Sequence, residues 1–180
     1  MDNIFKGEIL RQDTKAKSLS YYFTSDVVFI NEIIIKQLIE LSSTNNHCNA
    51  RICLHRNPKD NFHEMIIMEY SGNYYRPHKH LMKGESCHII EGNAYFAVFD
   101  DAGRLQEHCL LGSQGHKIAR AGINRWHVVI PATPYAIYHE SKPGPYLGAN
   151  DSVFPGWAPD GLDHEAAQSF QNELTAHMAL

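Results

Sequence analysis

The sequence has few cysteines, no long apolar run and no excess of positive charge. Its four cysteines form no CxxC pair, and scattered thiols in a chain of this size are typical of a reduced, cytoplasmic protein. No apolar stretch approaches the length of about 18 residues that a transmembrane helix needs. The first residues carry charges throughout and lack the apolar core of a signal peptide. We therefore expect a cytoplasmic protein without a membrane partner.

The charge balance excludes a further class of partner. Sixteen Lys and Arg stand against 20 Asp and Glu, which gives a net charge of −4. Nucleic acids and anionic membranes are bound through basic faces, so neither is an expected partner. A chain of 180 residues with 43% apolar residues is long enough to bury its own core as one domain.

Histidine is the residue type present in excess. The chain contains 12 His, and imidazole is both the commonest metal ligand and the usual general base near neutral pH. The composition therefore favours chemistry at histidine, although the count alone does not select the residues.

Apolar spacing predicts a mainly β protein with a helix near each end. Ile34, Leu38 and Leu41 follow Asn31 at helical spacing, with Asn31 as a good N-cap. Short β-like runs separated by Gly, Asp, Asn and Pro turns favour a sandwich or barrel. These runs are 27–30, 51–55, 65–68, 86–90, 95–99, 105–110, 123–130 and 135–139. A second apolar stripe, at Ala166 or Ala167, Phe170, Leu174 and Met178, predicts a C-terminal helix.

One segment combines metal-ligand residue types at a useful spacing. His78 and His80 are two residues apart, so on a strand both leave the same face, roughly 7 Å apart along the chain. Two imidazoles at that spacing can converge on one ion, about 2.1 Å from each nitrogen. Glu85 follows a short turn containing Gly84, and two His with a carboxylate form a facial set that leaves coordination positions open.

The glycines around this pair decide how specific the signal is. In a chain with 12 His, an HxH pair is expected roughly once by chance, and with Glu85 at its spacing about one time in twenty. Adding Gly72 and Gly92 at theirs lowers the expectation to the order of 10⁻⁴. The whole string, rather than the pair, carries the inference.

This string, G-x5-HxH-x4-E-x6-G, resembles the first motif of the cupins at every fixed position. The resemblance implies an all-β jelly roll, a double-stranded β-helix barrel, here with an N-terminal and a C-terminal helix. It also implies one divalent transition metal held by His78, His80, Glu85 and a histidine of the second motif. His127 is the matching residue, although the Pro and Gly of that motif are replaced by Gly122 and Asn124, a change compatible with a turn of positive φ. Its closing Asn is lost.

A narrower resemblance covers roughly residues 27–161. The segments RPHKH, FDDAGR, RWH and above all ESKPGPY with FPGWAPDG are similar to the WbuC-type cupin metalloproteins of bacterial surface-polysaccharide (O-antigen) gene clusters. It implies a sugar-derived small-molecule substrate, and because cupins commonly dimerise, it is compatible with a homodimer. The domain division is then an arm at 1–26, either loosely attached or an added edge strand, the cupin domain at 27–161, and a packed helix at 162–180.

Further site residues follow from strand parity and from position. Tyr74 and Arg76 share the parity of His78, and an Arg there could clamp a phosphate or carboxylate. Tyr138, Glu140 and Lys142 share one strand face. We assign Glu140 and Tyr138 to proton transfer, and a larger set to substrate binding: Tyr74, Arg76, Arg125, Lys142 and Tyr146.

Simpler interpretations remain open for each group. The first motif could be a polar surface hairpin, and His127 could be a core histidine beside Trp126. The site could also be metal-free, with His as a base. A surface position for Arg76 is equally compatible with the sequence. An ordinary ion pair between Glu140 and Lys142 is equally compatible as well.

Three functions fit these residues. The first is an isomerase or epimerase of a sugar or nucleotide-sugar, with the metal as Lewis acid. The second is a non-catalytic saccharide-binding or sensor protein. The third is a ferrous oxygenase, since this ligand set accepts Fe, Mn, Ni, Zn or Cu.

Overall fold

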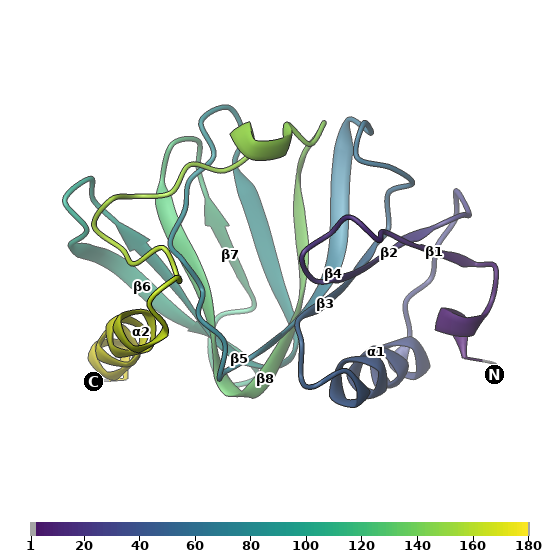
Figure 1. Ribbon diagram of the computed structural model, residues 1–180, viewed down its shortest axis with the longest axis horizontal. Helices are drawn as coiled ribbons and strands as arrows, with labels where there is room; N and C mark the ends of the chain where they lie inside the picture. Colours follow the sequence, from purple (N-terminus) through teal and green to yellow (C-terminus); the bar gives the residue numbers. More distant parts are fainter. Residues whose placement is uncertain (1–2, 180) are drawn as a thin grey trace.

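The computed structural model describes residues 3–179, which form one curled, eight-stranded β-sheet flanked by two helices (Figure 1). The strand order is β1-β2-β3-β4-β8-β5-β6, and β7 pairs with β5 beside this path. The strands are β1 (Leu10–Gln12), β2 (Leu19–Phe23), β3 (Ala50–Cys53), β4 (Phe62–Tyr70), β5 (Glu85–Phe99), β6 (Leu105–Leu111), β7 (Ile118–Ala121) and β8 (Trp126–Pro143). The helices are α1 (Glu32–Thr44), α2 (His164–Met178) and the short 3-10 turns η1 (Ile4–Lys6) and η2 (Gly148–Asn150). The predicted all-β class with a helix near each end is confirmed.

Two strands are much longer than the sequence predicts. The runs at 86–90 and 95–99 belong to one strand, β5, and the runs at 123–130 and 135–139 merge into β8 apart from their first residues. Gly92, expected in a turn, instead has a φ of 74° at a register shift of β5. A Cβ atom there would lie 2.4 Å from the carbonyl oxygen of Tyr135, so glycine lets the two strands bend together.

The first helix matches its prediction closely. Asn31 is its N-cap, and the side chain of Asn31 accepts hydrogen bonds from the backbone N–H groups of Ile33 and Ile34. Ile34 and Leu38 bury against the outer face of β3 and β4. The helix continues to Thr44, three residues beyond the predicted Leu41. The strand expected at Val27–Ile30 is wrong: this segment has no strand pairing, and Phe29 is 82% exposed.

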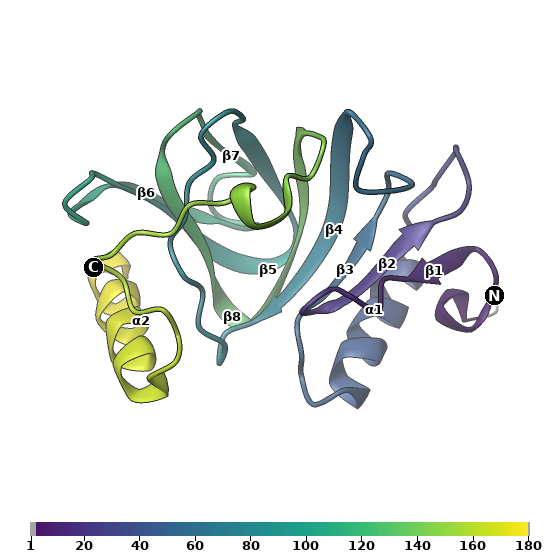
Figure 2. The ribbon, with the colours of Figure 1, turned by 45° about the horizontal axis from the view of Figure 1, so that its top comes forward.

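Both ends of the described chain join the β-structure (Figure 2). Strand β1 pairs with β2, and β2 pairs in parallel with β3, so the edge-strand alternative for the N-terminal arm matches the structure. Helix α2 begins after its N-cap Asp163 and packs Leu174 and Met178 against a cluster that contains Phe99 and Trp126. The arm and the C-terminal helix therefore lie on opposite flanks of the sheet.

Strand alternation places polar residues inside the curl. In β4, Ile66 and Met68 pack with α1, whereas Met65, Ile67 and Glu69 face the other way. In β5, Cys87 and Ile89 share this inner face with Glu85, and they pair with Glu140 and Tyr138 of β8. Because successive residues of a strand point to opposite faces, the acids of three strands converge inside the sheet.

Two stacked histidines, His55 in the β3–β4 connection and His63 in β4, make the stability pH-dependent. The rings of His55 and His63 lie 4.0 Å apart and nearly parallel. Burial and the neighbouring His63 lower the pKa of His55 from 6.5 to about 4, and burial with nearby Lys83 lowers the pKa of His63. Both groups are therefore neutral in the folded chain, whereas the unfolded chain takes up their protons once the pH falls below about 6.5.

We expect the free energy of unfolding to fall as the pH is lowered from 6.5 towards about 4. The variant His63→Phe keeps a stacked ring and removes a buried Nε2 atom that has no hydrogen-bond partner among residues 3–179. Urea unfolding of both proteins at several pH values tests this: the variant should lose less stability on acidification. Identical pH slopes for the two proteins would contradict the assignment.

Candidate metal centre

The backbone brings three histidines from two segments together. His78 and His127 form an isolated antiparallel bridge, in which the N–H of each donates to the carbonyl oxygen of the other at 3.0 and 2.9 Å. The N–H of Asn124 donates to the carbonyl of His80 at 2.8 Å, and Asn124 has a φ of 59°. The positive φ compatible with the second motif is thus present at this turn, which aligns His78 and His80 with the start of β8.

Glu85 reaches the histidines because β5 begins directly after a point where two backbone segments approach each other closely. A Cβ atom on Gly84 would lie 2.7 Å from the carbonyl oxygen of Ala121, so only glycine allows β5 and β7 to come this close here. Glu85 pairs with Ala121 and is buried. Its carboxylate therefore enters the inner face at the level of the histidines.

The four side chains form a compact donor set. Nε2 of His127 lies 2.7 Å from Oε1 of Glu85, and Nε2 of His80 lies 3.0 Å from Oε2. One ligand atom from each of His78, His80, Glu85 and His127 lies within 4.8 Å of the others. Ligand atoms at right angles around an ion, about 2.1 Å from it, lie roughly 3 Å apart. The donor types and spacing therefore fit a divalent transition metal.

The outer nitrogens of two histidines are occupied by backbone carbonyls. Nδ1 of His80 contacts the carbonyl oxygen of Asp151, and Nδ1 of His127 contacts that of Arg125 at 2.8 Å. A nitrogen facing a carbonyl oxygen carries the proton, which leaves the Nε2 lone pairs aimed at the carboxylate of Glu85. Such an arrangement orients metal-ligating histidines, and it requires a cation beside these atoms, either extra protons or a metal ion.

The electrostatics of the cluster agree with this requirement. Burial opposes charge on Glu85, but Lys142 and the hydrogen bonds from His127 and His80 hold its pKa well below the usual value. Burial also opposes protonation of His127, yet its hydrogen bond to Glu85 and the charge of Glu85 raise its pKa. Burial and the neighbouring His127 lower the pKa of His78 to about 3. His78 is thus held neutral in a site that attracts positive charge.

A second carboxylate and a lysine stand beside the cluster. Nζ of Lys142 lies 2.8 Å from Oε1 of Glu140 and 3.3 Å from Oε2 of Glu85. Glu140 also lies opposite Cys87 on β5, and these two residues with Glu85 form a second group of adjacent ligand-type atoms. Burial and the nearby Glu140 raise the pKa of Cys87 well above the usual value, so its thiol stays protonated.

Tyr138 and Glu69 complete the inner wall. Tyr138 is buried, and burial together with Glu69 raises the pKa of its hydroxyl well above 10.0. Burial raises the pKa of Glu69 to about 8, and its hydrogen bond to Tyr138 opposes this rise. Glu69 is not among the residues predicted from the sequence. Its inward parity with Met65 and Ile67, as the one acid on that face of β4, is the signal that could have found it.

Asp151 and Lys83 hold the loop that supports His80. Nζ of Lys83 lies 2.6 Å from Oδ1 of Asp151, and both side chains are buried. The N–H of Val153 and the carbonyl of Lys79 pair across the same loop at 2.9 Å. The segment 78–80 is therefore fixed on both sides, by β8 and by the loop after η2, and neither Asp151 nor Lys83 carries a spacing that identifies it in the sequence.

The remaining predicted substrate residues do not line this inner space. Residues 72–77 form no regular strand, so parity does not aim Tyr74 and Arg76 at the metal cluster, and they line a neighbouring pocket, the outer pocket, instead. The side chain of Arg125 is exposed, and only its carbonyl touches the site. Tyr146 is 56% exposed in the loop that packs on Pro58. Of this predicted set, Lys142 is the member whose side chain contacts the cluster.

A family described as "Domain of unknown function (DUF6016)" matches residues 30–111, which is less than half of the chain. No curated protein matches the sequence. Among residues 3–179, no helix is long and apolar enough to cross a membrane.

Several solved structures are similar in part. Protein SO0799 from Shewanella oneidensis is 10% identical at a TM-score of 0.44, with 53% of this chain and 63% of that chain covered. A mutant oxalate decarboxylase from Bacillus subtilis is 15% identical at a TM-score of 0.46, with 59% of this chain and 28% of that chain covered. KdgF from Halomonas sp. is 15% identical at a TM-score of 0.41, with 53% of this chain and 77% of that chain covered. The match thus spans less than two thirds of the length of SO0799 and of the oxalate decarboxylase. The strand order and the two flanking helices match the all-β class, with a helix near each end, that the sequence predicts.

Proposed function

We propose that this protein is a metal-dependent enzyme that isomerises or epimerises a small sugar-derived molecule at the inner face of the sheet. The observation that carries the proposal is the pair of Nε2 atoms, on His80 and His127, aimed at opposite oxygens of the buried Glu85 carboxylate. His78 would be the fourth ligand. The resemblance of the 143–161 loop to WbuC-type cupins supports the sugar-derived substrate and a role in surface-polysaccharide synthesis.

A divalent metal bound here would act as a Lewis acid that polarises a carbonyl or vicinal diol of the substrate. The charges of the inner wall suit such an ion. Three carboxylates, Glu69, Glu85 and Glu140, share this space with one ammonium group, that of Lys142. Because Glu69 has a pKa of about 8, it is largely neutral at pH 7, and a divalent ion would compensate the remaining carboxylates.

Proton transfer is assigned to Glu140 and Tyr138. Lys142 donates to Glu140 at 2.8 Å, which fixes this carboxylate beside the cluster, where it would accept a proton from a carbon next to the polarised carbonyl. Tyr138 keeps its proton because of its raised pKa, so its hydroxyl can donate a hydrogen bond to a developing oxyanion. Glu69, behind Tyr138, holds a second proton at neutral pH.

Metal analysis and isotope exchange test the proposal together. Protein purified without chelator should contain one transition-metal ion per chain. In D₂O, the metal-loaded protein should catalyse exchange of the α-proton of a nucleotide-linked keto sugar. Mass spectrometry of the sugar measures this exchange. Tight binding of a sugar without exchange would favour a binding protein, and oxygen uptake by the ferrous form would favour an oxygenase; either result overturns the isomerase proposal.

The variant Glu140→Gln should slow this exchange by about 10²-fold or more, because it removes the base and keeps the side-chain volume. Its metal content should match that of the wild type, since Glu140 is not one of the four ligands. Glu107→Gln, at an exposed position of β6, serves as the control and should exchange normally. An unchanged rate in Glu140→Gln would remove Glu140 from the mechanism.

A further inference from the structure

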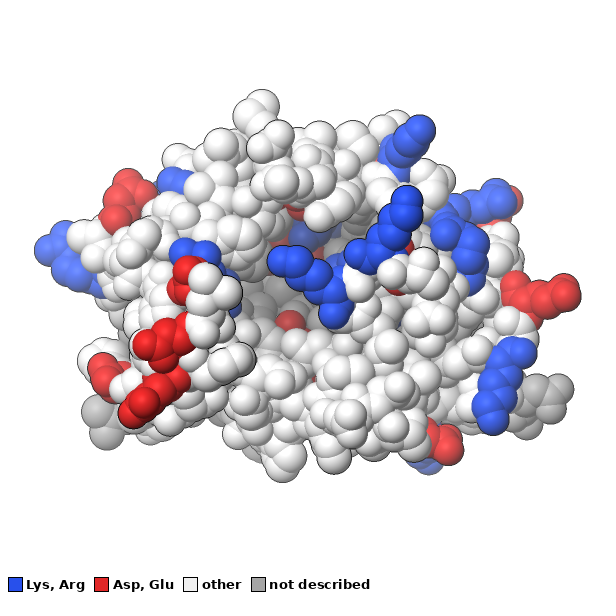
Figure 3. Space-filling model, in the orientation of Figure 1, with Lys and Arg blue, Asp and Glu red and all other residues white. Residues whose placement is uncertain are grey.

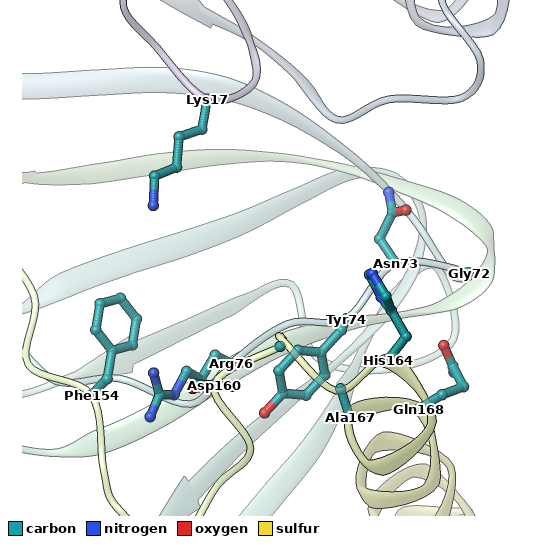
Figure 4. Close-up of a pocket in the computed structure, with 11 residues that line it drawn as sticks. Lys17, Gly72, Asn73, Tyr74, Arg76, Phe154, Asp160, His164, Ala167 and Gln168 are labelled. Atoms are coloured by element: carbon teal, nitrogen blue, oxygen red, sulfur yellow. The ribbon is translucent and has the colours of Figure 1, made fainter.

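An outer pocket of about 600 Å³ lies beside the candidate metal centre (Figure 4). Ligand sites commonly have volumes of roughly 300–1,000 Å³, so a small molecule would fit. The pocket joins three distant parts of the chain: the β1–β2 loop, the segment before His78, and the loop that leads into α2. Its principal polar and aromatic side chains are Lys17, Tyr74, Arg76, Phe154, Asp160 and His164.

Arg76 presents an unneutralised charge to this pocket. One terminal nitrogen donates to the carbonyl oxygens of Pro155 at 3.0 Å and Ala158 at 3.4 Å. Within residues 3–179 no carboxylate lies within 4.0 Å of its guanidinium, and its buried Nε has no hydrogen-bond partner. A guanidinium has five N–H donors and binds phosphate or carboxylate with two of them. The donors not taken by carbonyls are available for such a group.

Lys17 provides a second cation from another element. It extends from the β1–β2 loop across the pocket, towards the side where Phe154 and Arg76 lie (Figure 4). In the described part of the chain it makes no ion pair. The one acid of the lining is Asp160, whose Oδ1 accepts a hydrogen bond from the N–H of Leu162. Two cations against one carboxylate leave the pocket with a positive charge in a protein whose net charge is −4.

Phe154 links this pocket to the metal centre. Its ring centroid lies 6.3 Å from that of His78, and Cζ of Arg76 lies 5.2 Å above its ring. His78, the least buried of the four ligands, is also only two residues from Arg76. In the space-filling view, the hollow of this face has Lys and Arg at its rim and acidic atoms at its floor (Figure 3). A ligand in the pocket would therefore lie within reach of the metal centre.

We infer that Arg76 and Lys17 bind an anionic group, a phosphate or a carboxylate, at one end of a substrate whose other end reaches the metal centre past Phe154. This inference rests on the proposed function for the metal end, whereas the anion site is independent of it. The N-terminal arm, through Lys17, is then part of the substrate site.

Binding of inorganic phosphate tests the anion site, and bound Mn²⁺ tests its proximity to the centre. Calorimetric titration at low salt should show one phosphate site on the chelated protein, weakened about tenfold or more in Lys17→Glu and in Arg76→Gln. Lys15→Glu changes the same charge in the same loop at an exposed position outside the pocket, and it should bind like the wild type. If acetate competes as strongly as phosphate, the site binds carboxylates. If acetate does not compete, the site is specific for phosphate.

With Mn²⁺ loaded, the ³¹P relaxation of phosphate should be enhanced in the wild type and in Lys15→Glu, and should fall to the free-solution value in Lys17→Glu. Equal phosphate affinity in all variants would overturn the anion site, and Lys17→Glu decides this even if Arg76→Gln fails to fold. Phosphate binding that depends on Lys17 but shows no relaxation enhancement, in protein with Mn²⁺ bound, would overturn the link to the centre. A protein that binds phosphate but no Mn²⁺ would overturn the metal proposal and leave the anion site standing.

Discussion

Replacing His80 or His127 by alanine should abolish stoichiometric metal binding, with a loss of affinity of at least about 100-fold. Loss of an outer-shell partner alone commonly costs 10–100-fold, and these variants remove a ligand whose Nε2 lies 3.0 or 2.7 Å from Glu85. Metal analysis by mass spectrometry after dialysis against metal-free buffer measures the effect. His88→Ala is the matched control, because His88 lies on the same strand as Glu85 with its side chain exposed.

Metal binding should also be visible as stability. A metal at 100 to 1,000 times its dissociation constant stabilises the folded state by about 2.7–4 kcal/mol. For a chain of this size, in which 1 kcal/mol shifts Tm by about 2–4 °C, this corresponds to a rise in Tm of roughly 5–16 °C. The rise should occur in the wild type and in His88→Ala and be absent in the ligand variants. A His80→Ala protein with wild-type metal content and the same Tm shift would exclude the assigned ligand set.

Lys142→Met should destabilise the chelated protein by about 3–5 kcal/mol, the usual cost of leaving a buried charge without its partner. Lys142 contacts both Glu140 and Glu85, and these charges raise its pKa against the effect of burial. Without it, two buried carboxylates face each other with only His127 and His80 as partners of Glu85. Denaturant unfolding of the chelated protein measures the loss.

The same variant separates a structural lysine from one that supports the metal site. Because a divalent ion replaces the missing positive charge, adding metal should restore more stability to Lys142→Met than it adds to the wild type. Lys36→Met, at an exposed position of α1, is the control and should change stability by less than about 0.5 kcal/mol. A loss below about 1 kcal/mol in chelated Lys142→Met would show that the pair with Glu140 contributes little.

Local sequence signals predicted the elements whose stability is local. The helical spacing of Ile34 and Leu38, with the Asn31 cap, predicted α1 because these residues contact their own helix and one sheet face. The turns expected around Gly92 and Pro131 were wrong, because they lie inside β5 and β8. Strand β4 pairs with β8 only from Tyr135 onward, so Pro131 interrupts no ladder with β4. Such partners are far away in the sequence, and turn propensity cannot report them.

The candidate site divides in the same way. The amino-acid pattern alone was enough to predict the all-β class and the candidate ligands around His78, because ligand type and spacing within one short segment are local properties. Which charged groups join these ligands depended on how distant strands pair. Inward parity on β4 and β8 brought Glu69, Tyr138, Glu140 and Lys142 to the inner wall. The irregular backbone before His78 turned Tyr74 and Arg76 to the outer pocket, opposite Lys17. Burial and charge at these positions depend on strands paired across many residues, and no single stretch of sequence contains that information.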